Sequence, residues 1–214
     1  MALSRESVRL CFALGTAALL WFYMFSPWTQ GAPNFWIVMS CSAVVLTTLG
    51  LVFRFRKSFS FSRPLLQIAG GVVLALALWA VFWVGDRLSS LMFGFARAEV
   101  DAVYAMKQGL PLPLIAALLL VLIGPAEEFF WRGCIQEALS RILPGRRAAD
   151  WAFVVTAVLY ALIHVWSFNF MLIMAALVAG IVWGLGYRLC PKALPALMIS
   201  HALWDALVFV VWPI

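Results

Sequence analysis

The chain has 214 residues, of which 65% are hydrophobic and 11% are charged. Its mean hydropathy is +1.02. Soluble domains carry about 25% charged residues, so this composition excludes a water-soluble globule. Seven membrane spans of about 20 residues each need about 140 apolar residues, which matches the composition. We therefore expect an all-α, polytopic bundle of about seven transmembrane helices that forms a single membrane domain over residues 1–214.

Seven apolar runs follow one another along the chain and are separated by short polar segments. The runs extend over residues 8–25, 35–53, 65–85, 111–143, 151–166, 170–187 and 194–212. The first run lacks the small-x-small pattern of a signal-peptide cleavage site, so we expect it to be a retained span. The charges of residues 86–109 sum to zero, and this segment is predicted to form a short interfacial helix.

Basic residues are concentrated in alternate loops. They are Arg5 and Arg9 before the first span, then Arg54, Arg56, Lys57 and Arg63, then Arg141, Arg146 and Arg147, and then Arg188 and Lys192. The intervening loops at 26–34 and 167–169 carry no charge. Because cytoplasmic loops are enriched in Lys and Arg, the amino terminus is predicted to be cytoplasmic and the carboxyl terminus to lie outside. The net charge of +6 then reflects topology and contact with anionic lipid, and we expect no nucleic-acid partner.

Ionisable side chains also lie inside the fourth, fifth and seventh predicted spans. An ionisable group at membrane depth costs about 2.5–3.5 kcal/mol on insertion scales, so its default interpretation is functional. Two histidines are present in the whole chain, and both lie in this set. The clusters are Glu127-Glu128-x-x-x-Arg132, Tyr160-x-x-x-His164 and His201-x-x-x-Asp205.

Residue spacing assigns these groups to helix faces. Glu128 and Arg132 are four residues apart and can form an ion pair on one face. Glu127 then lies about 100° around the helix and is free to face another partner. His201 and Asp205 share a face in the same way. At a rise of about 1.5 Å per residue, the clusters reach overlapping depths, so we expect one site inside the bundle.

This set of side chains fits hydrolysis of a peptide bond by an activated water molecule. Glu127 would act as the general base, and His164 would share the water or relay its proton to the leaving amine. His201 and Asp205 would bind the carbonyl oxygen as it gains negative charge.

A second arrangement uses the same atoms to hold a metal. Two histidines and a glutamate, namely Glu127, His164 and His201, could bind zinc, which would acidify the water directly. The chain has no His-Glu-x-x-His pair on one helix, so the familiar zinc-protease motif is absent. We therefore expect that no cofactor is required, with zinc as the alternative.

The three clusters, in this order on late spans, resemble the CAAX-processing and bacteriocin-processing (CPBP, or Abi) family. These proteins are intramembrane glutamic endopeptidases related to the prenyl-protein (CAAX) protease. The resemblance implies a catalytic core over residues 111–214, preceded by variable spans over residues 1–110. It implies that Glu127 is the catalytic glutamate and that His164 is its partner in activating water.

The resemblance also assigns the remaining polar residues. It implies that His201 and Asp205 bind the oxyanion. It implies that Glu128 and Arg132 support the site. Two positions depart from the family pattern. The second motif usually begins with Phe, whereas Tyr160 adds a hydroxyl that can hydrogen-bond in the site. The third motif often ends in Asn, whereas Asp205 must be protonated to donate a hydrogen bond in the same way.

The sequence therefore predicts an intramembrane protease. Its expected partners are the lipid bilayer and a membrane-associated, prenylated, leader or sorting-signal peptide. The alternative is a non-proteolytic relative, either a bacteriocin self-immunity protein or an ion or proton carrier. A carrier would be expected to contain inverted repeats, and the sequence has no such symmetry. The predicted location is a bacterial inner membrane, with the chain as a multi-pass integral protein.

Overall fold

The computed structural model describes residues 4–29, 34–53 and 61–214. These residues are almost entirely helical and contain no β-strand, and seven of their helices are long and apolar enough to cross a membrane. The predicted all-α bundle of seven spans is therefore confirmed. Of the basic residues used to orient the chain, Arg54, Arg56 and Lys57 lie outside the described residues.

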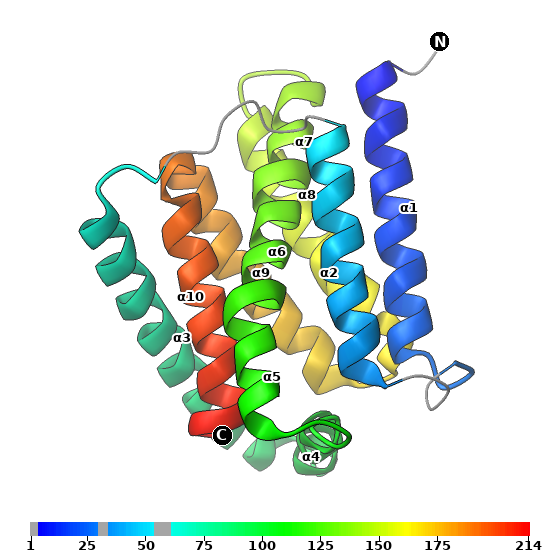
Figure 1. Cartoon of the computed structure of the whole chain (residues 1–214), viewed down its shortest axis with the longest axis vertical. Coiled ribbons are helices and arrows are strands. Elements are labelled where there is room, and N and C mark those ends of the chain that lie inside the picture. The colour runs from blue at the N-terminus through cyan, green and yellow to red at the C-terminus, as the bar shows by residue number, and fades with distance from the viewer. Residues whose placement is uncertain (1–3, 30–33, 54–60) are drawn as a thin grey trace.

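The spans follow the chain in the predicted order (Figure 1). The first three are α1 (Arg5–Phe25), α2 (Phe35–Val52) and α3 (Pro64–Met92). The fourth, Leu112–Ile142, contains α5 (Leu112–Leu118), α6 (Gly124–Glu128) and α7 (Glu137–Ile142). The last three are Ala148–Ser167 with α8 (Ala148–Leu162), α9 (Phe170–Leu189), and Pro191–Val211 with α10 (Leu194–Ala206).

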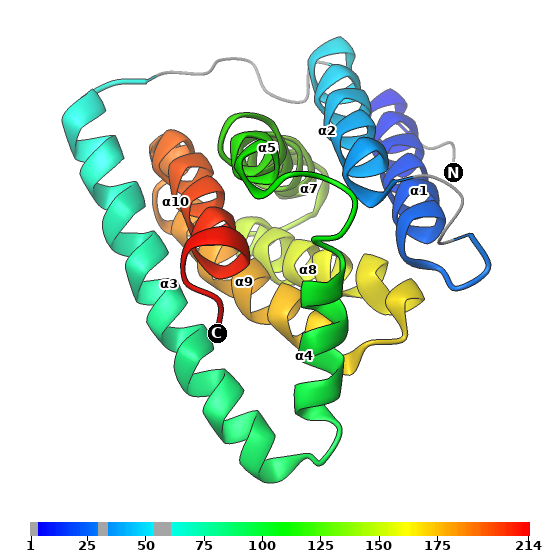
Figure 2. The same cartoon turned by 60° about the horizontal axis from the view of Figure 1, so that its bottom comes forward.

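The third span is longer than the sequence predicted. Its expected end was at residue 85, before the first charge, but the helix continues to Met92. Asp86 and Arg97 form an ion pair at 3.1 Å, so the charge at position 86 is paired rather than a signal to end the helix. Arg97 belongs to α4 (Ala96–Ala105), the predicted short helix. Figure 2 shows α4 lying across the end of the bundle near the carboxyl terminus.

Side-chain caps begin three of the spans. The Ser4 side chain accepts from the Ser7 N–H at the start of α1. The Asn34 side chain accepts from the Trp36 N–H at the start of α2, and the Asn169 side chain accepts from the Leu172 N–H at the start of α9. Glu99 of α4 adds a second bond there, because its carboxylate accepts from the Met171 N–H at 2.8 Å. Such caps satisfy backbone donors that have no partner within the helix. Glu99 therefore fixes α4 to the beginning of α9.

The fourth span and α10 are in close contact at a glycine. A Cβ atom on Gly124 would lie 2.7 Å from both Cα and N of Ala202, which is closer than packed atoms can come. Small residues permit this kind of close approach between membrane helices. The contact matters for the site, because Glu127 and Glu128 follow Gly124 and His201 precedes Ala202.

We expect Gly124→Ala to destabilise the protein by about 1–3 kcal/mol, because the new methyl group meets backbone atoms that cannot rotate away. The matched control is Gly15→Ala on α1, where an added Cβ has nothing within 4 Å; this change should leave stability unchanged or raise it slightly. Thermal unfolding in detergent, followed by tryptophan fluorescence, measures both. Equal melting temperatures for the two variants would contradict the close helix contact.

Candidate active site

The fourth span changes its helical geometry on both sides of the adjacent glutamates. π-helical turns over Leu119–Ile123 and Phe129–Gln136 flank α6, and a third, Leu207–Val211, follows α10. Pro125 has no N–H to donate to the helix. π-helical turns are rare and occur frequently at functional sites. The backbone is therefore irregular at the two places where the sequence motifs put carboxylates.

Glu128, Arg132 and His201 form a buried charge cluster. Arg132 Nη1 donates to Glu128 Oε1 at 2.7 Å, and both side chains are fully buried. The ion pair predicted from the spacing is therefore confirmed. His201 Nδ1 lies 2.9 Å from the same carboxylate oxygen. Glu128 Oε1 therefore contacts a side chain of its own span, Arg132, and a side chain of α10, His201.

Arg132 also contacts the helices on its other side. Its Nη2 donates to the Gly180 carbonyl oxygen of α9 at 3.4 Å. Its guanidinium lies 4.8 Å from the ring centroid of Tyr160 and 5.5 Å from that of Trp183. Cations over aromatic faces are stabilised most where water is excluded. The arginine therefore joins the fourth span to α8 and α9.

Glu127 faces away from this ion pair, as the helical spacing predicts. Its Oε2 accepts a hydrogen bond from the Tyr160 hydroxyl at 2.8 Å. Glu127 is 6% exposed and Tyr160 is 5% exposed, so the bond is shielded from lipid and from bulk water. The hydroxyl that distinguishes Tyr160 from the Phe of the family pattern thus orients the proposed general base.

Both ring nitrogens of His164 have partners. Nδ1 lies 2.8 Å from the Tyr160 carbonyl oxygen, and Nε2 lies 3.1 Å from Nε1 of Trp21 on α1. A carbonyl oxygen can only accept and an indole N–H can only donate. The two partners therefore select the neutral tautomer that carries its hydrogen on Nδ1 and its lone pair on Nε2.

His201 lies between two carboxylates. Its Nδ1 faces Glu128, as described above, and its Nε2 lies 3.4 Å from Asp205 Oδ2. The ring stacks on Trp183, with centroids 3.9 Å apart and an interplanar angle of 17°. The Nε2 contact is longer than an ordinary hydrogen bond. Another acceptor can therefore compete with Asp205 for this nitrogen.

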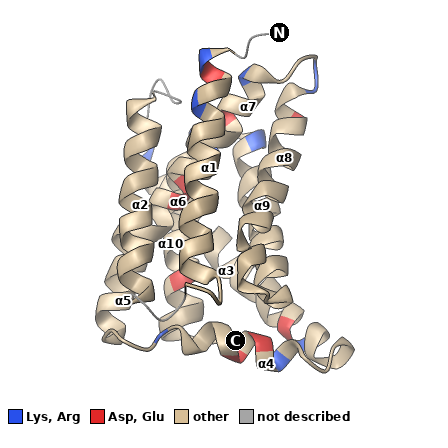
Figure 3. Ribbon diagram, turned by 90° about the vertical axis from the view of Figure 1, so that its right-hand side faces the viewer, with Lys and Arg blue, Asp and Glu red and all other residues tan. Residues whose placement is uncertain are grey.

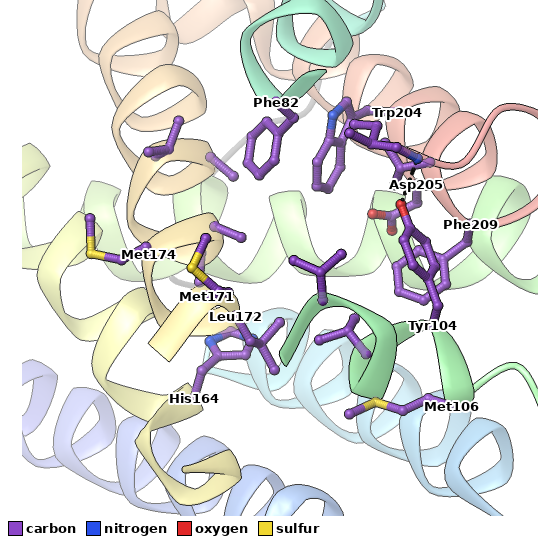
Figure 4. A pocket seen from close by; sticks show the side chains of 18 of the residues that line it. Phe82, Tyr104, Met106, His164, Met171, Leu172, Met174, Trp204, Asp205 and Phe209 are labelled. Carbon is purple, nitrogen blue, oxygen red and sulfur yellow. Dashed lines mark hydrogen bonds between the residues drawn. The ribbon is translucent and has the colours of Figure 1, made fainter. Parts of the chain in front are cut away.

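The predicted site residues meet at one cavity of about 500 Å³, within the range of about 300–1,000 Å³ that is usual for ligand pockets. Glu127, Tyr160, His164, His201 and Asp205 all line it. Figure 4 shows His164 and Asp205 on different sides of the cavity. Glu128 and Arg132 do not line it and lie behind the wall. The structure therefore brings together the residues that the sequence selected from three separate spans.

The arrangement does not fit a zinc ion. Among the described residues, no group of three or more His, Cys, Asp or Glu side chains is placed to hold a metal. The lone pair of His164 faces Trp21, and the nitrogens of His201 face two carboxylates. Because these nitrogens already have partners within the protein, we route no step of the reaction through a metal.

Sequence reasoning missed two tryptophans that position the histidines. Trp21 and Trp183 are 1% and 0% exposed, and they contact His164 and His201 respectively. Trp21 is 143 residues away from His164 in the chain, so no periodicity or motif could pair them. A weaker signal was present, because Trp21 lies inside its span, whereas tryptophans that anchor a protein at the interface lie near span ends.

Comparison with known proteins gives one match. Residues 109–207 match the family model described as Type II CAAX prenyl endopeptidase Rce1-like. No curated protein and no solved structure matches the chain. The matched range contains all three motifs and every polar residue of the cavity discussed above. The resemblance inferred from the motifs is therefore confirmed: residues 109–207 are similar to the type II CAAX prenyl endopeptidase Rce1-like family.

Proposed function

We propose that the chain is an intramembrane endopeptidase that hydrolyses a peptide bond of a membrane-associated polypeptide. The observation that carries the proposal is the placement of Glu127 on the wall of a largely apolar cavity, with its carboxylate held by Tyr160. The family match supports a protease, and the geometry supports the chemistry. No contact among the described residues favours the self-immunity or carrier alternative.

Glu127 is the proposed general base. A carboxylate takes a proton efficiently when it is fixed within hydrogen-bond reach of the attacking water. The Tyr160 hydroxyl occupies one oxygen of Glu127 and leaves the other available for that water. His164 is its proposed partner, because the ring presents its lone pair on Nε2. Because this lone pair accepts from the Trp21 N–H in the structure, a water can donate to Nε2 only when that bond opens, so the proton transfer falls mainly to Glu127.

His201 and Asp205 are the proposed oxyanion partners. The developing negative charge on the carbonyl oxygen is stabilised by donors that are already in place. When the ring carries a hydrogen on both nitrogens, His201 Nε2 can turn its hydrogen bond from Asp205 to that oxygen, because the existing contact is 3.4 Å long. Glu128 holds the opposite nitrogen of the ring and Trp183 supports its face. The ring therefore keeps its orientation when the Asp205 contact opens.

The substrate is expected to be rich in apolar residues. Side chains such as Phe82, Met171, Met174 and Phe209 line the cavity around the polar groups (Figure 4). The family is described by its action on prenylated CAAX proteins, and a leader or sorting-signal peptide has the same apolar character. We propose that the reaction uses the chain's own groups and needs no resident cofactor.

Glu127→Gln should lower the rate of cleavage at least a hundredfold, because the amide keeps the shape of the side chain but removes the base. The assay is hydrolysis of a quenched fluorescent peptide by purified protein in detergent. Glu137→Gln is the matched control, because Glu137 likewise accepts a hydrogen bond from a tyrosine, Tyr187 at 2.7 Å, but lies outside the cavity. Retention of full activity by the Glu127 variant would rule out the proposed mechanism.

Tyr160→Phe should lower kcat by about threefold to tenfold, because one orienting hydrogen bond of about 0.5–1.5 kcal/mol is lost. KM should stay unchanged, since the hydroxyl is directed at Glu127. Tyr187→Phe removes the equivalent hydroxyl from Glu137 and should leave both constants as they are. If the Tyr160 variant changes KM alone, or behaves like the Tyr187 variant, the Tyr160 hydroxyl does not orient the general base.

A further inference from the structure

We propose that Trp21 of α1 keeps the site in a resting state by donating its indole N–H to His164, and that a substrate in the cavity opens this bond by displacing Phe25. The inference rests on the proposed endopeptidase function and adds a control of the same site by a helix outside the matched segment 109–207. It is carried by the Trp21 bond itself, by a second bond that holds the His164 ring, and by the position of Phe25 at the cavity wall.

The Trp21 bond occupies the one lone pair that the His164 ring can offer to water. Trp21 Nε1 donates to His164 Nε2 at 3.1 Å, and the two side chains are 1% and 7% exposed. A neutral imidazole has a single acceptor nitrogen. The other nitrogen, Nδ1, carries the hydrogen because it faces the Tyr160 carbonyl oxygen. A water molecule must therefore displace the indole N–H before His164 can take part in activating it.

The indole and the water reach His164 from different parts of the structure. His164 lines the cavity, whereas Trp21 does not. The buried residues of α1 recur every three or four positions, as on one packed helix face; they are Leu10, Ala13, Ala17, Trp21, Met24 and Phe25. Trp21 therefore approaches His164 from the packed face of α1, and water approaches it from the cavity.

The His164 ring keeps its orientation when the Trp21 bond opens. Its Nδ1 lies 2.8 Å from the Tyr160 carbonyl oxygen, one helical turn earlier in the same span. The Tyr160 ring also packs edge-on against the imidazole, with centroids 5.4 Å apart. Neither contact involves α1. Opening of the Trp21 bond thus frees the lone pair on Nε2 without freeing the ring.

Phe25 connects the cavity to Trp21. Its ring lines the cavity, and its centroid lies 5.5 Å from that of His164 and 5.6 Å from that of Phe35, which lines the cavity as well. Phe25 follows Trp21 by four residues, so both side chains lie on the same face of α1. An apolar substrate that fills this end of the cavity displaces Phe25, and the last turn of α1 moves with it. A shift of about 1 Å, typical of helix movements in switching proteins, is enough to open a hydrogen bond of 3.1 Å.

α1 is attached to the bundle separately at its two ends. Figure 3 shows that its charged residues lie near the amino terminus. There Glu6 pairs with Arg141 of α7 at 2.7 Å. At the other end, Phe22 packs against Trp166, in the turn that carries His164, with ring centroids 5.0 Å apart. Apolar contacts are non-directional, so this end of α1 can shift slightly while the ion pair holds the opposite end.

Loss of the indole N–H should strengthen substrate binding. In the main variant, Trp21 is replaced by 3-benzothienylalanine, whose ring has nearly the same shape but carries sulfur in place of the N–H; Trp21→Phe is the second variant. In the parent, part of the binding free energy opens the bond. KM of each variant for the quenched fluorescent peptide should therefore fall about twofold to tenfold, the range of one neutral hydrogen bond. The value of kcat should stay unchanged, because the bond is already open in the bound state.

Trp79 provides the matched control. Its Nε1 donates to the Trp212 carbonyl oxygen at 3.0 Å, and it does not line the cavity. The same two replacements at Trp79 remove an indole N–H of the same kind and should leave KM and kcat as they are. Thermal unfolding in detergent verifies that every variant is folded.

Acylation of His164 by diethyl pyrocarbonate measures the bond without any cleavage. The reagent reacts with the lone pair of a neutral imidazole, so the Trp21 bond slows the reaction. Without the indole N–H, His164 should react about twofold to tenfold faster in the absence of peptide. His201, the second of the two histidines in the chain, is the internal reference and should keep its rate. Mass spectrometry of proteolytic peptides resolves the two sites.

An unchanged or higher KM in the benzothienylalanine variant would overturn the proposal, and so would a changed kcat. Equal effects of the replacements at Trp21 and Trp79 would also overturn it, because a general loosening of the bundle would then be responsible.

The proposed function and the resting-state contact fail separately. If Glu127→Gln keeps its activity while His164 reacts faster in the Trp21 variant, the catalytic assignment fails and the Trp21 contact stands. If Glu127→Gln is inactive while the Trp21 variant keeps the KM and the His164 reactivity of the parent, the resting-state contact fails and the catalytic assignment stands.

Discussion

One oxygen atom, Oε1 of Glu128, holds the centre of this structure together. It accepts from Arg132 at 2.7 Å and lies 2.9 Å from His201 Nδ1. A charge buried without a partner costs several kcal/mol, and removal of one partner from a buried pair destabilises strongly. The fourth span and α10 must therefore stay in one relative position. The Gly124 contact with Ala202 makes that position sterically accessible, and Arg132 extends the same constraint to α8 and α9.

The position of the proposed base follows from this constraint. Because Glu128 points toward Arg132 and His201, the adjacent Glu127 points to a different part of the bundle, where the Tyr160 hydroxyl meets it. The same network separates the two histidines by environment. His164 is held by a carbonyl oxygen and an indole N–H, whereas His201 is held between carboxylates. Two chemically identical side chains thus lie in different environments, in keeping with the different roles proposed for them, one at the attacking water and one at the oxyanion.

Local sequence patterns predicted most of the fold and much of the site. The apolar runs gave the seven spans, and the four-residue spacing gave both the ion pair of Glu128 with Arg132 and the different direction of Glu127. The third span exceeded its predicted length, and Asp86, where the helix was expected to have ended, is paired with Arg97, twelve residues beyond the expected helix end. The contact of Trp21 with His164 was missed for a related reason. Contacts between helices distant in sequence depend on how the bundle packs, which hydrophobic periodicity alone does not determine.

The central claim is that Glu128 and Arg132 act as one energetic unit in the packed bundle. A double-mutant cycle with Glu128→Gln and Arg132→Met, scored by the free energy of unfolding in bicelles, tests this claim most directly. We expect each single change to cost about 3–5 kcal/mol, because it leaves an uncompensated buried charge. The double variant should then cost at least about 1 kcal/mol less than the two single costs added together. Additive costs would contradict the claim, because the two residues would then stabilise the bundle independently of each other.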